Sequence, residues 1–225
     1  SSHNGTVEVV VTATDEADNI VESTVVLTAK DNEAPVLVVE EDQDVVLDAD
    51  CSITVPNLID GSSAADNCVV TITQSPVAGT IVSSSHNGTV EVVVTATDEA
   101  ENIDELTVVL TAKDNEAPVL IAEADQEVIL DADCSITVPN LVDGSSATDN
   151  CMVTITQSPV VGTIVESSHN GTVDVIVTAT DAANNKVEST VVLTAKDNEA
   201  PVLAAEADQE VILDADCSIT VPNLV

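Results

Sequence analysis

The segment Thr89–Asp98 reads TVEVVVTATD, and every second side chain from Val90 to Ala96 is apolar. Alternation of this kind is typical of a β-strand that buries one face against a core. The segment therefore predicts a strand with one aliphatic face. That face carries Val90, Val92, Val94 and Ala96, and the opposite face carries Thr89, Glu91, Thr95 and Thr97.

The chain repeats itself at one constant interval. The nonapeptide AKDNEAPVL begins at Ala29, Ala112 and Ala195, and DADCSITVPNL recurs with the same spacing. The DNEAP stretch is a natural boundary, because proline fixes φ, lacks an amide donor and fits poorly inside a central strand. We therefore expect two complete repeats between two partial ones, in an array that continues in both directions. The divisions are 1–30 (the C-terminal part of a repeat), 31–113 (repeat 1), 114–196 (repeat 2) and 197–225 (the N-terminal part of a repeat).

Alternating apolar residues and turn signals recur throughout repeat 1. Seven short strands within one such repeat, with no convincing helix, are typical of an immunoglobulin-like β-sandwich. The sequence thus predicts an all-β chain of tandem immunoglobulin-like sandwich domains arranged head to tail. The expected strands lie near Pro35–Val39, Asp44–Leu47, Cys51–Leu58, Val69–Thr73, Thr80–Ser83, Thr89–Thr97 and Leu106–Ala112.

The chain is strongly acidic, since 4 Lys and Arg against 41 Asp and Glu give a formal net charge of −37 on 225 residues. Nucleic acids and anionic membranes attract basic surfaces, so neither is expected as a partner. Direct membrane insertion is not expected either, because no apolar run approaches the roughly 20 residues of a membrane span. The 44% of hydrophobic residues is nevertheless enough to build cores, and without Phe, Tyr or Trp those cores must consist of aliphatic side chains.

Each complete repeat contains two cysteines at a constant separation. An even number at constant spacing predicts one disulfide per repeat, Cys51 with Cys68 and Cys134 with Cys151, in an oxidising, extracellular setting. Zinc binding is a weaker alternative, because one repeat offers two cysteines and one histidine where zinc needs four ligands. Thiol catalysis would need a histidine partner and an orienting group, and no such set is recognisable, so no enzyme activity is expected.

Several motifs occur in the order found in a known extracellular module. They are APVL at the start of a repeat, DADCSITVPNL, ATDNC in repeat 2, and VTATDEAEN before the last strand. Together they resemble the HYR domain (hyalin repeat), an immunoglobulin-like module of extracellular proteins. One departure is the final hairpin, where that family often has AGN and the three copies here have EADN, EAEN and AANN.

The tandem arrangement carries a second resemblance. Near-identical, very acidic copies that are poor in lysine resemble the giant repetitive surface adhesins of gliding Bacteroidetes, of the SprB type. That resemblance implies export by a type IX secretion system and display at the cell surface. It also implies a filament that the gliding machinery moves along the cell.

The immunoglobulin-like topology places an acidic turn of one repeat against the linker of the next. In that topology the turn Asp48–Asp50 lies at the lower pole of repeat 1, and the linker and two loops of repeat 2 lie at its upper pole. So many oxygen atoms suit a hard cation with six to eight ligands, Ca²⁺ above all, and DNEAP also resembles the calcium-binding DNxP linker of cadherins. The alternative left open is that these acids are solvated turn residues. The predicted ligands of an interdomain calcium ion are Asp48, Asp50, Asp114, Asn115, Glu116, Asp143, Asp149 and Asp181.

The favoured function is structural. The repeats would be spacer units in the stalk of a secreted cell-surface filament or adhesin, and their partners would be neighbouring repeats of the same chain and other filament chains. Alternatively, each repeat is itself a binding module for a polysaccharide, an external surface or a protein. The lack of aromatic side chains and of a large apolar patch favours the spacer.

Overall fold

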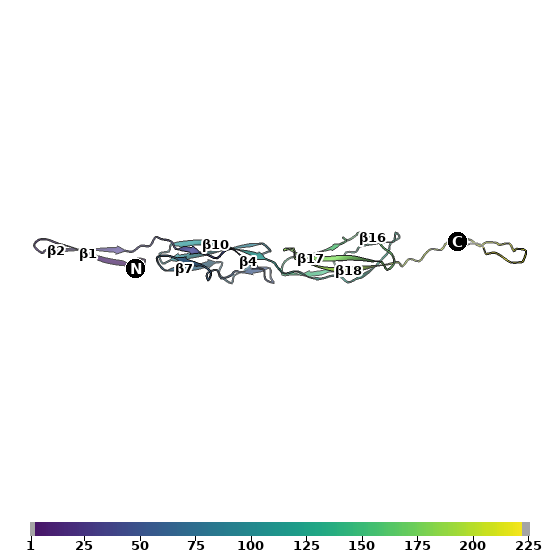
Figure 1. Ribbon diagram of the computed structural model, residues 1–225, viewed down its shortest axis with the longest axis horizontal. Coiled ribbons are helices and arrows are strands. Elements are labelled where there is room, and N and C mark those ends of the chain that lie inside the picture. The colour runs from purple at the N-terminus through teal and green to yellow at the C-terminus, as the bar shows by residue number, and fades with distance from the viewer. Residues whose placement is uncertain (1–2, 222–225) are drawn as a thin grey trace.

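The computed structural model describes residues 3–221 as an elongated rod built from β-strands (Figure 1). No helix occurs within this range, so none is long and apolar enough to cross a membrane. A hairpin at the N-terminal end consists of β1 (Thr6–Thr14) and β2 (Ile20–Thr28). The strands of repeat 1 are β3 (Val36–Val38), β4 (Gln43–Val46), β5 (Ser52–Thr54), β6 (Ser63–Ala65), β7 (Val70–Ser75), β8 (Ile81–Ser83), β9 (Thr89–Asp98) and β10 (Ile103–Lys113). Those of repeat 2 are β11 (Val119–Ile121), β12 (Gln126–Ile129), β13 (Ser135–Thr137), β14 (Ser146–Thr148), β15 (Val153–Ser158), β16 (Ile164–Glu166), β17 (Thr172–Asp181) and β18 (Lys186–Lys196).

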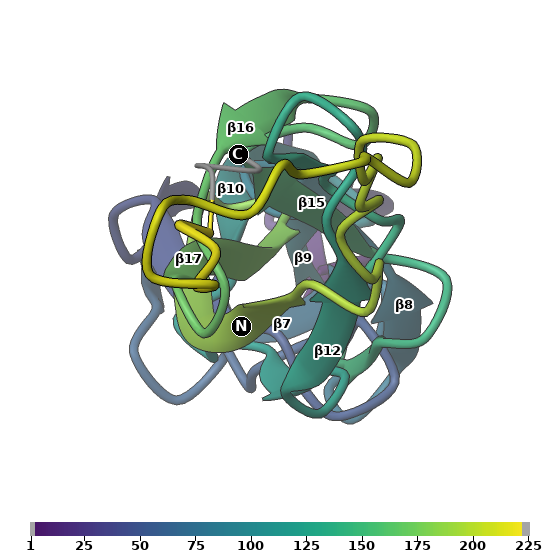
Figure 2. The ribbon, with the colours of Figure 1, turned by 90° about the vertical axis from the view of Figure 1, so that its right-hand side faces the viewer.

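Each repeat is a β-sandwich with one continuous sheet and one interrupted layer. In repeat 1 the continuous sheet has the order β4-β10-β9-β7, and the second layer consists of the pairs β3-β6 and β5-β8. Strand β4 runs parallel to β10, whereas the other pairs are antiparallel. Repeat 2 has the same order in β12-β18-β17-β15, β11-β14 and β13-β16. Viewed along the rod, the strands lie around a shared centre (Figure 2). The predicted all-β tandem sandwich is therefore confirmed.

The core of each repeat is aliphatic, as the missing aromatic residues require. The alternation in β9 is confirmed, because Val92, Val94 and Ala96 are fully buried between the two layers. Leu110 on β10 packs into the same cluster, and repeat 2 has its own cluster around Leu193. Each repeat thus buries its own apolar faces, which is the main stabilising term for a domain of this kind.

One strand of each repeat is absent from the sequence-based expectation. The segment Asp60–Asn67 reads as a loop, but it contains β6, whose Ser63 and Ala65 pair with Val38 and Val36 of β3. Small residues without an apolar alternation form a strand here because an adjacent edge supplies their hydrogen-bond partners. The equivalent strand of repeat 2, β14, lies between Asp143 and Asp149 and so separates these two predicted calcium ligands.

The β1–β2 hairpin closely resembles the last hairpin of each repeat in sequence, but it has no second layer packed on it. Val9 is 40% exposed, whereas the equivalent Val92 is fully buried. The two strands still pair along their whole length, from Thr6 with Thr28 to Thr14 with Ile20. The two strands therefore keep their register without a second layer, and burial depends on the opposite layer.

Candidate functional site

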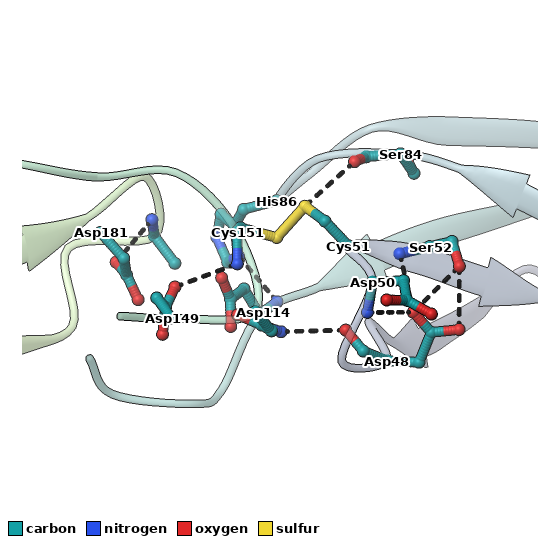
Figure 3. The surroundings of a disulfide bond; sticks show 12 residues. Asp48, Asp50, Cys51, Ser52, Ser84, His86, Asp114, Asp149, Cys151 and Asp181 are labelled. Atoms are coloured by element: carbon teal, nitrogen blue, oxygen red, sulfur yellow. Dashed lines mark hydrogen bonds between the residues drawn. A yellow bond between two sulfur atoms is a disulfide. The ribbon is translucent and has the colours of Figure 1, made fainter. Parts of the chain in front are cut away.

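The candidate site is the central junction, where repeat 1 meets repeat 2 (Figure 3). Repeat 1 contributes two turns at its lower pole, Asp48–Ser52 and Ser84–Gly88. Repeat 2 contributes the linker Asp114–Pro118, the loop around Asp149–Cys151, and the turn Asp181–Asn185. The predicted apposition of an acidic turn and an acidic linker is thus what the structure contains at this point.

A disulfide bond crosses this junction and joins Cys51 of repeat 1 to Cys151 of repeat 2. The predicted pairings within one repeat are therefore wrong, and Cys68 and Cys134 are free thiols. The two cysteines of a repeat lie at opposite poles: Cys51 follows a lower turn, whereas Cys68 lies beside Asp31 at the upper pole. Tracing the chain from pole to pole would have shown this, because the segment between them crosses the length of the sandwich once.

The turn Asp48–Ser52 presents the Cys51 thiol to repeat 2. The Asp48 carboxylate accepts hydrogen bonds from Asp50 N (3.0 Å), Ser52 N (3.0 Å) and Ser52 Oγ (2.8 Å). Chiefly because of the Ser52 hydroxyl, the pKa of Asp48 lies below its ordinary value. Cys51 itself has φ of +54°, a left-handed conformation that favours glycine. A cysteine at this position is therefore explained by its sulfur and not by its backbone.

Three carboxylates of repeat 2 gather beside the disulfide. Asp114, Asp149 and Asp181 each offer an oxygen atom, and these atoms lie within 4.8 Å of one another. Asp114 is only 3% exposed and Asp181 only 6%. Three buried oxygens here, Asp114 Oδ2, Asp149 Oδ1 and Asn150 Oδ1, accept no hydrogen bond from any described residue. Buried oxygen atoms without partners are costly, so a donor or a cation would stabilise the cluster.

Each carboxylate is held by a different segment. The Asp181 carboxylate accepts hydrogen bonds from Ala183 N (2.8 Å), Asn185 N (2.8 Å) and Asn185 Nδ2 (2.7 Å), which closes its turn. Asp149 Oδ2 accepts from Cys151 N at 3.3 Å, so the disulfide-bonded cysteine also orients this aspartate. The neighbouring Asn150 Nδ2 donates to the Asp48 carbonyl across the junction at 3.3 Å.

A histidine of repeat 1 positions the first linker residue. His86 Nδ1 accepts a hydrogen bond from Asp114 N at 3.1 Å, and the Asp114 side chain accepts one from Glu116 N at 3.1 Å. The histidine beside the Asn-Gly turn reads as a plain surface residue in the sequence. Its constant separation from the linker aspartate in every copy is the signal that could have identified it. The same contact recurs in His3–Asp31 and His169–Asp197, at 3.3 Å and 3.0 Å.

Asn185 is a second residue that sequence reasoning missed. Its Nδ2 donates to the Glu116 carbonyl at 2.9 Å as well as to Asp181, and so it joins the linker to the last hairpin. The signal was available, because an asparagine closes this hairpin in all three copies, at Asn19, Asn102 and Asn185.

The remaining predicted ligands lie outside the carboxylate cluster. Asp48 uses its carboxylate within its own turn, and Asp50, Asn115 and Glu116 are exposed. Asp143 is also exposed, and it lies at the opposite end of β14 from Asp149. The structure thus brings together Asp114, Asp149 and Asp181, and the other four predicted carboxylates do not join that group.

The donor set fits a hard divalent cation. All the unpartnered atoms are carboxylate or amide oxygens, which Ca²⁺ prefers, and the nearby sulfur is consumed in the disulfide. The adjacent Lys113 does not neutralise the cluster, because its Nζ bonds Asn87 Oδ1 (2.8 Å) and pairs with Asp44 (3.7 Å). A hollow of about 250 Å³ beside the cluster is lined by Ala49, Glu116, Ala117, Val119, Thr148, Asp149 and Asn150.

The corresponding place at the upper pole of repeat 1 holds a free thiol. Cys68 lies with Asp31 and Asp66 in a group whose ligand atoms are within 4.8 Å. Hydrogen bonding to Asp31 raises the pKa of the Cys68 thiol to about 11, and the same contact lowers the pKa of Asp31. The negative Asp31 carboxylate opposes formation of a thiolate beside it.

We expect an Asp31→Asn variant to be alkylated at Cys68 by iodoacetamide at pH 8 about tenfold faster than the unaltered chain. Removing the neighbouring charge raises the thiolate fraction, while the lower nucleophilicity of a less basic thiolate offsets part of that gain. Mass spectrometry of the labelled peptides gives the rate for each cysteine. Cys134 is the internal control and should react equally in both chains. Equal rates at Cys68 would show that Asp31 does not govern this thiol.

Comparison with known proteins found no matching family profile and no matching curated protein. Among solved structures, the chain is similar to protocadherin gammaB7 EC3-6 in a cis-dimer structure, with 14% identity and a TM-score of 0.39 over 86% of this chain and 58% of that one. It is also similar to sidekick-1 immunoglobulin domains 1–4, with 15% identity and a TM-score of 0.40 over 83% and 57% of the two chains. Human mucin-like protocadherin EC1-2 matches at 12% identity and a TM-score of 0.37, over 72% and 98%. The chain thus spans little more than half the length of the first two structures.

Proposed function

We propose that these repeats are spacer units in the stalk of a secreted cell-surface filament or adhesin. The observation that carries the proposal is the Cys51–Cys151 disulfide, which ties one sandwich to the next. A covalent bond between neighbouring domains holds them in line, which is what a stalk requires. Disulfides persist in oxidising compartments, which supports an extracellular location.

Within this class, we propose the stalk of a gliding-motility filament exported by a type IX secretion system. The support is the resemblance of the near-identical acidic repeats to SprB-type adhesins and of their motifs to HYR domains. The net charge of −37 is consistent with a stalk that repels other acidic surfaces and stays extended. Its partners are the neighbouring repeats and, in a bundle, other filament chains.

Calcium completes the junction in this proposal. Asp114, Asp149 and Asp181 would hold the ion, because their carboxylate oxygens converge. Two of these oxygens, Asp114 Oδ2 and Asp149 Oδ1, have no hydrogen-bond partner. Bound Ca²⁺ would supply positive charge to three close carboxylates and would join the linker, the loop and the last hairpin of repeat 2.

The spacer function is tested by the shape of the chain in solution. We expect small-angle X-ray scattering of the oxidised chain to fit a straight rod, and a Cys51→Ser/Cys151→Ser variant to have a smaller average maximum dimension. Without the bond, the two repeats are joined at one linker and can bend about it. A Cys134→Ser chain is the matched control, because it removes a free thiol. Micromolar binding of the chain to polysaccharide-coated beads, with no effect of the disulfide on shape, would instead indicate a binding module.

A further inference from the structure

We propose that the cross-junction disulfide limits how far the stalk can be stretched. Cys51 and Cys151 are 100 residues apart in sequence, and Cys134, the counterpart of Cys51 in repeat 2, lies between them. The closed loop is therefore longer than one repeat. Tension that enters at Cys51 leaves at Cys151 through the sulfur–sulfur bond. The intervening residues 52–150 then carry none of it, even if their sandwich layers come apart.

The cysteine needed to continue this pattern lies inside the loop. Cys134 precedes Cys151 in repeat 2. Its backbone has the same left-handed conformation as that of Cys51, with φ of +55° against +54°. Its turn has the same hydrogen bonds: Cys134 N donates to Asp131 O at 3.1 Å, and Ser167 N donates to Cys134 O at 3.0 Å. The equivalent bonds at Cys51 are both 3.1 Å. The lower pole of repeat 2 therefore has the geometry needed for the same cross-link.

The surface that receives the partner loop also recurs. At the central junction, Ala49, Glu116, Ala117 and Val119 line a hollow together with the loop Thr148–Asn150. One period later, Ala132, Glu199, Ala200 and Val202 line a cavity of about 640 Å³ that includes Cys134. Its occupant, we infer, is the matching loop of a following repeat, which carries the counterpart of Cys151.

Successive loops of this kind overlap, because the second begins at Cys134 and the first ends only at Cys151. In such an array the shortest covalent path across one repeat runs along the segment Cys134–Cys151 and through one disulfide bond. Without the disulfides, the path would run along every residue of the repeat. Fully extended, that segment spans about 60 Å and a whole repeat spans about 290 Å. Strand β18 alone spans about 36 Å when folded. A stalk cross-linked in this way lengthens less than twofold even when every repeat unfolds.

The biological role of this extension limit rests on the proposed stalk function, but the limit itself can be measured separately. Single chains held at their two ends should extend about 350 Å less at high force when oxidised than after treatment with a dithiol, because 100 residues are bypassed. The dithiol supplies two electrons and two protons to the two sulfurs and is itself oxidised to a cyclic disulfide. A Cys51→Ser/Cys151→Ser chain should match the reduced length, and a Cys68→Ser chain should match the oxidised length. Final extension does not depend on folding, so a poorly folded variant remains informative.

Equal extension of the oxidised and reduced chains would overturn the proposal. Its second part is tested by inserting a copy of residues 31–113 after Lys196, so that Cys134 stays in a unique peptide, and mapping the disulfide-linked peptides. Cys134 should then be joined to the inserted copy of Cys68, which is the counterpart of Cys151, and a Cys134 that stays reduced would reject the overlapping ladder. Both results are independent of the shape and bead-binding measurements, so the stalk function and the extension limit can fail separately.

Discussion

Replacing Leu110 with alanine is expected to lower the free energy of unfolding of repeat 1 by about 2–5 kcal/mol. Leu110 is fully buried in a cluster that contains only aliphatic side chains, so its loss leaves a cavity that no large aromatic neighbour can fill. A small sandwich has a total stability of roughly 5–15 kcal/mol, and the substitution removes a large part of it.

The internal repeat supplies matched controls for this experiment. Leu193 occupies the same position in repeat 2 and is also fully buried, whereas Leu27 occupies it in the β1–β2 hairpin and is 57% exposed. Leu193→Ala should therefore destabilise repeat 2 by a similar amount, and Leu27→Ala should change stability by less than about 0.5 kcal/mol. Hydrogen exchange followed by mass spectrometry assigns each change to its repeat. Equal effects of Leu27→Ala and Leu110→Ala would contradict the assignment of the core.

Calcium is expected to stabilise repeat 2 by about 2.7 kcal/mol when its concentration is 100 times the dissociation constant. The expected increase arises because the ion would bind the folded cluster and not the unfolded chain. Calorimetry with calcium and with a chelator measures the rise in Tm. An Asp114→Asn chain should lose most of the increase, since Asp114 is the most buried member of the cluster.

The same variant separates ion binding from simple loss of structure. Without calcium, Asp114→Asn should be at least as stable as the unaltered chain, because it removes one of three close negative charges. Asp143→Asn removes a carboxylate of repeat 2 that lies outside the cluster, and it should keep the full calcium effect. An unchanged Tm at millimolar calcium would show that the cluster does not bind this ion.

Short-range patterns account for the parts of this structure that could be predicted. Alternation places Val92 and Val94 on one face of their strand because successive side chains point to opposite faces, and the second layer of the sandwich then buries that face. The exceptions show the limit of such patterns. Strand β6 has no apolar alternation and exists because β3 offers it an unpaired edge.

The candidate site shows the same division. The pole-to-pole trace correctly brings the Asp48–Asp50 turn to the linker, where Ala49 lines one hollow with Glu116 and Ala117, since that follows from the order of strands. It does not decide which acids turn inward. Asp48 satisfies its carboxylate within its own turn, and β14 carries Asp143 away from Asp149.

Most strands, the aliphatic core and the repeat period can be derived from the amino-acid order, because each depends on residues close together in the chain or on copies of them. The partner of Cys51, and the three carboxylates that meet beside it, emerge from the folded arrangement instead. Counting cysteines pairs those that are near in sequence, but a disulfide requires two sulfurs to be near in space. In a sandwich about one strand long, the cysteines of one repeat lie at opposite ends, and the nearest partner belongs to the next repeat.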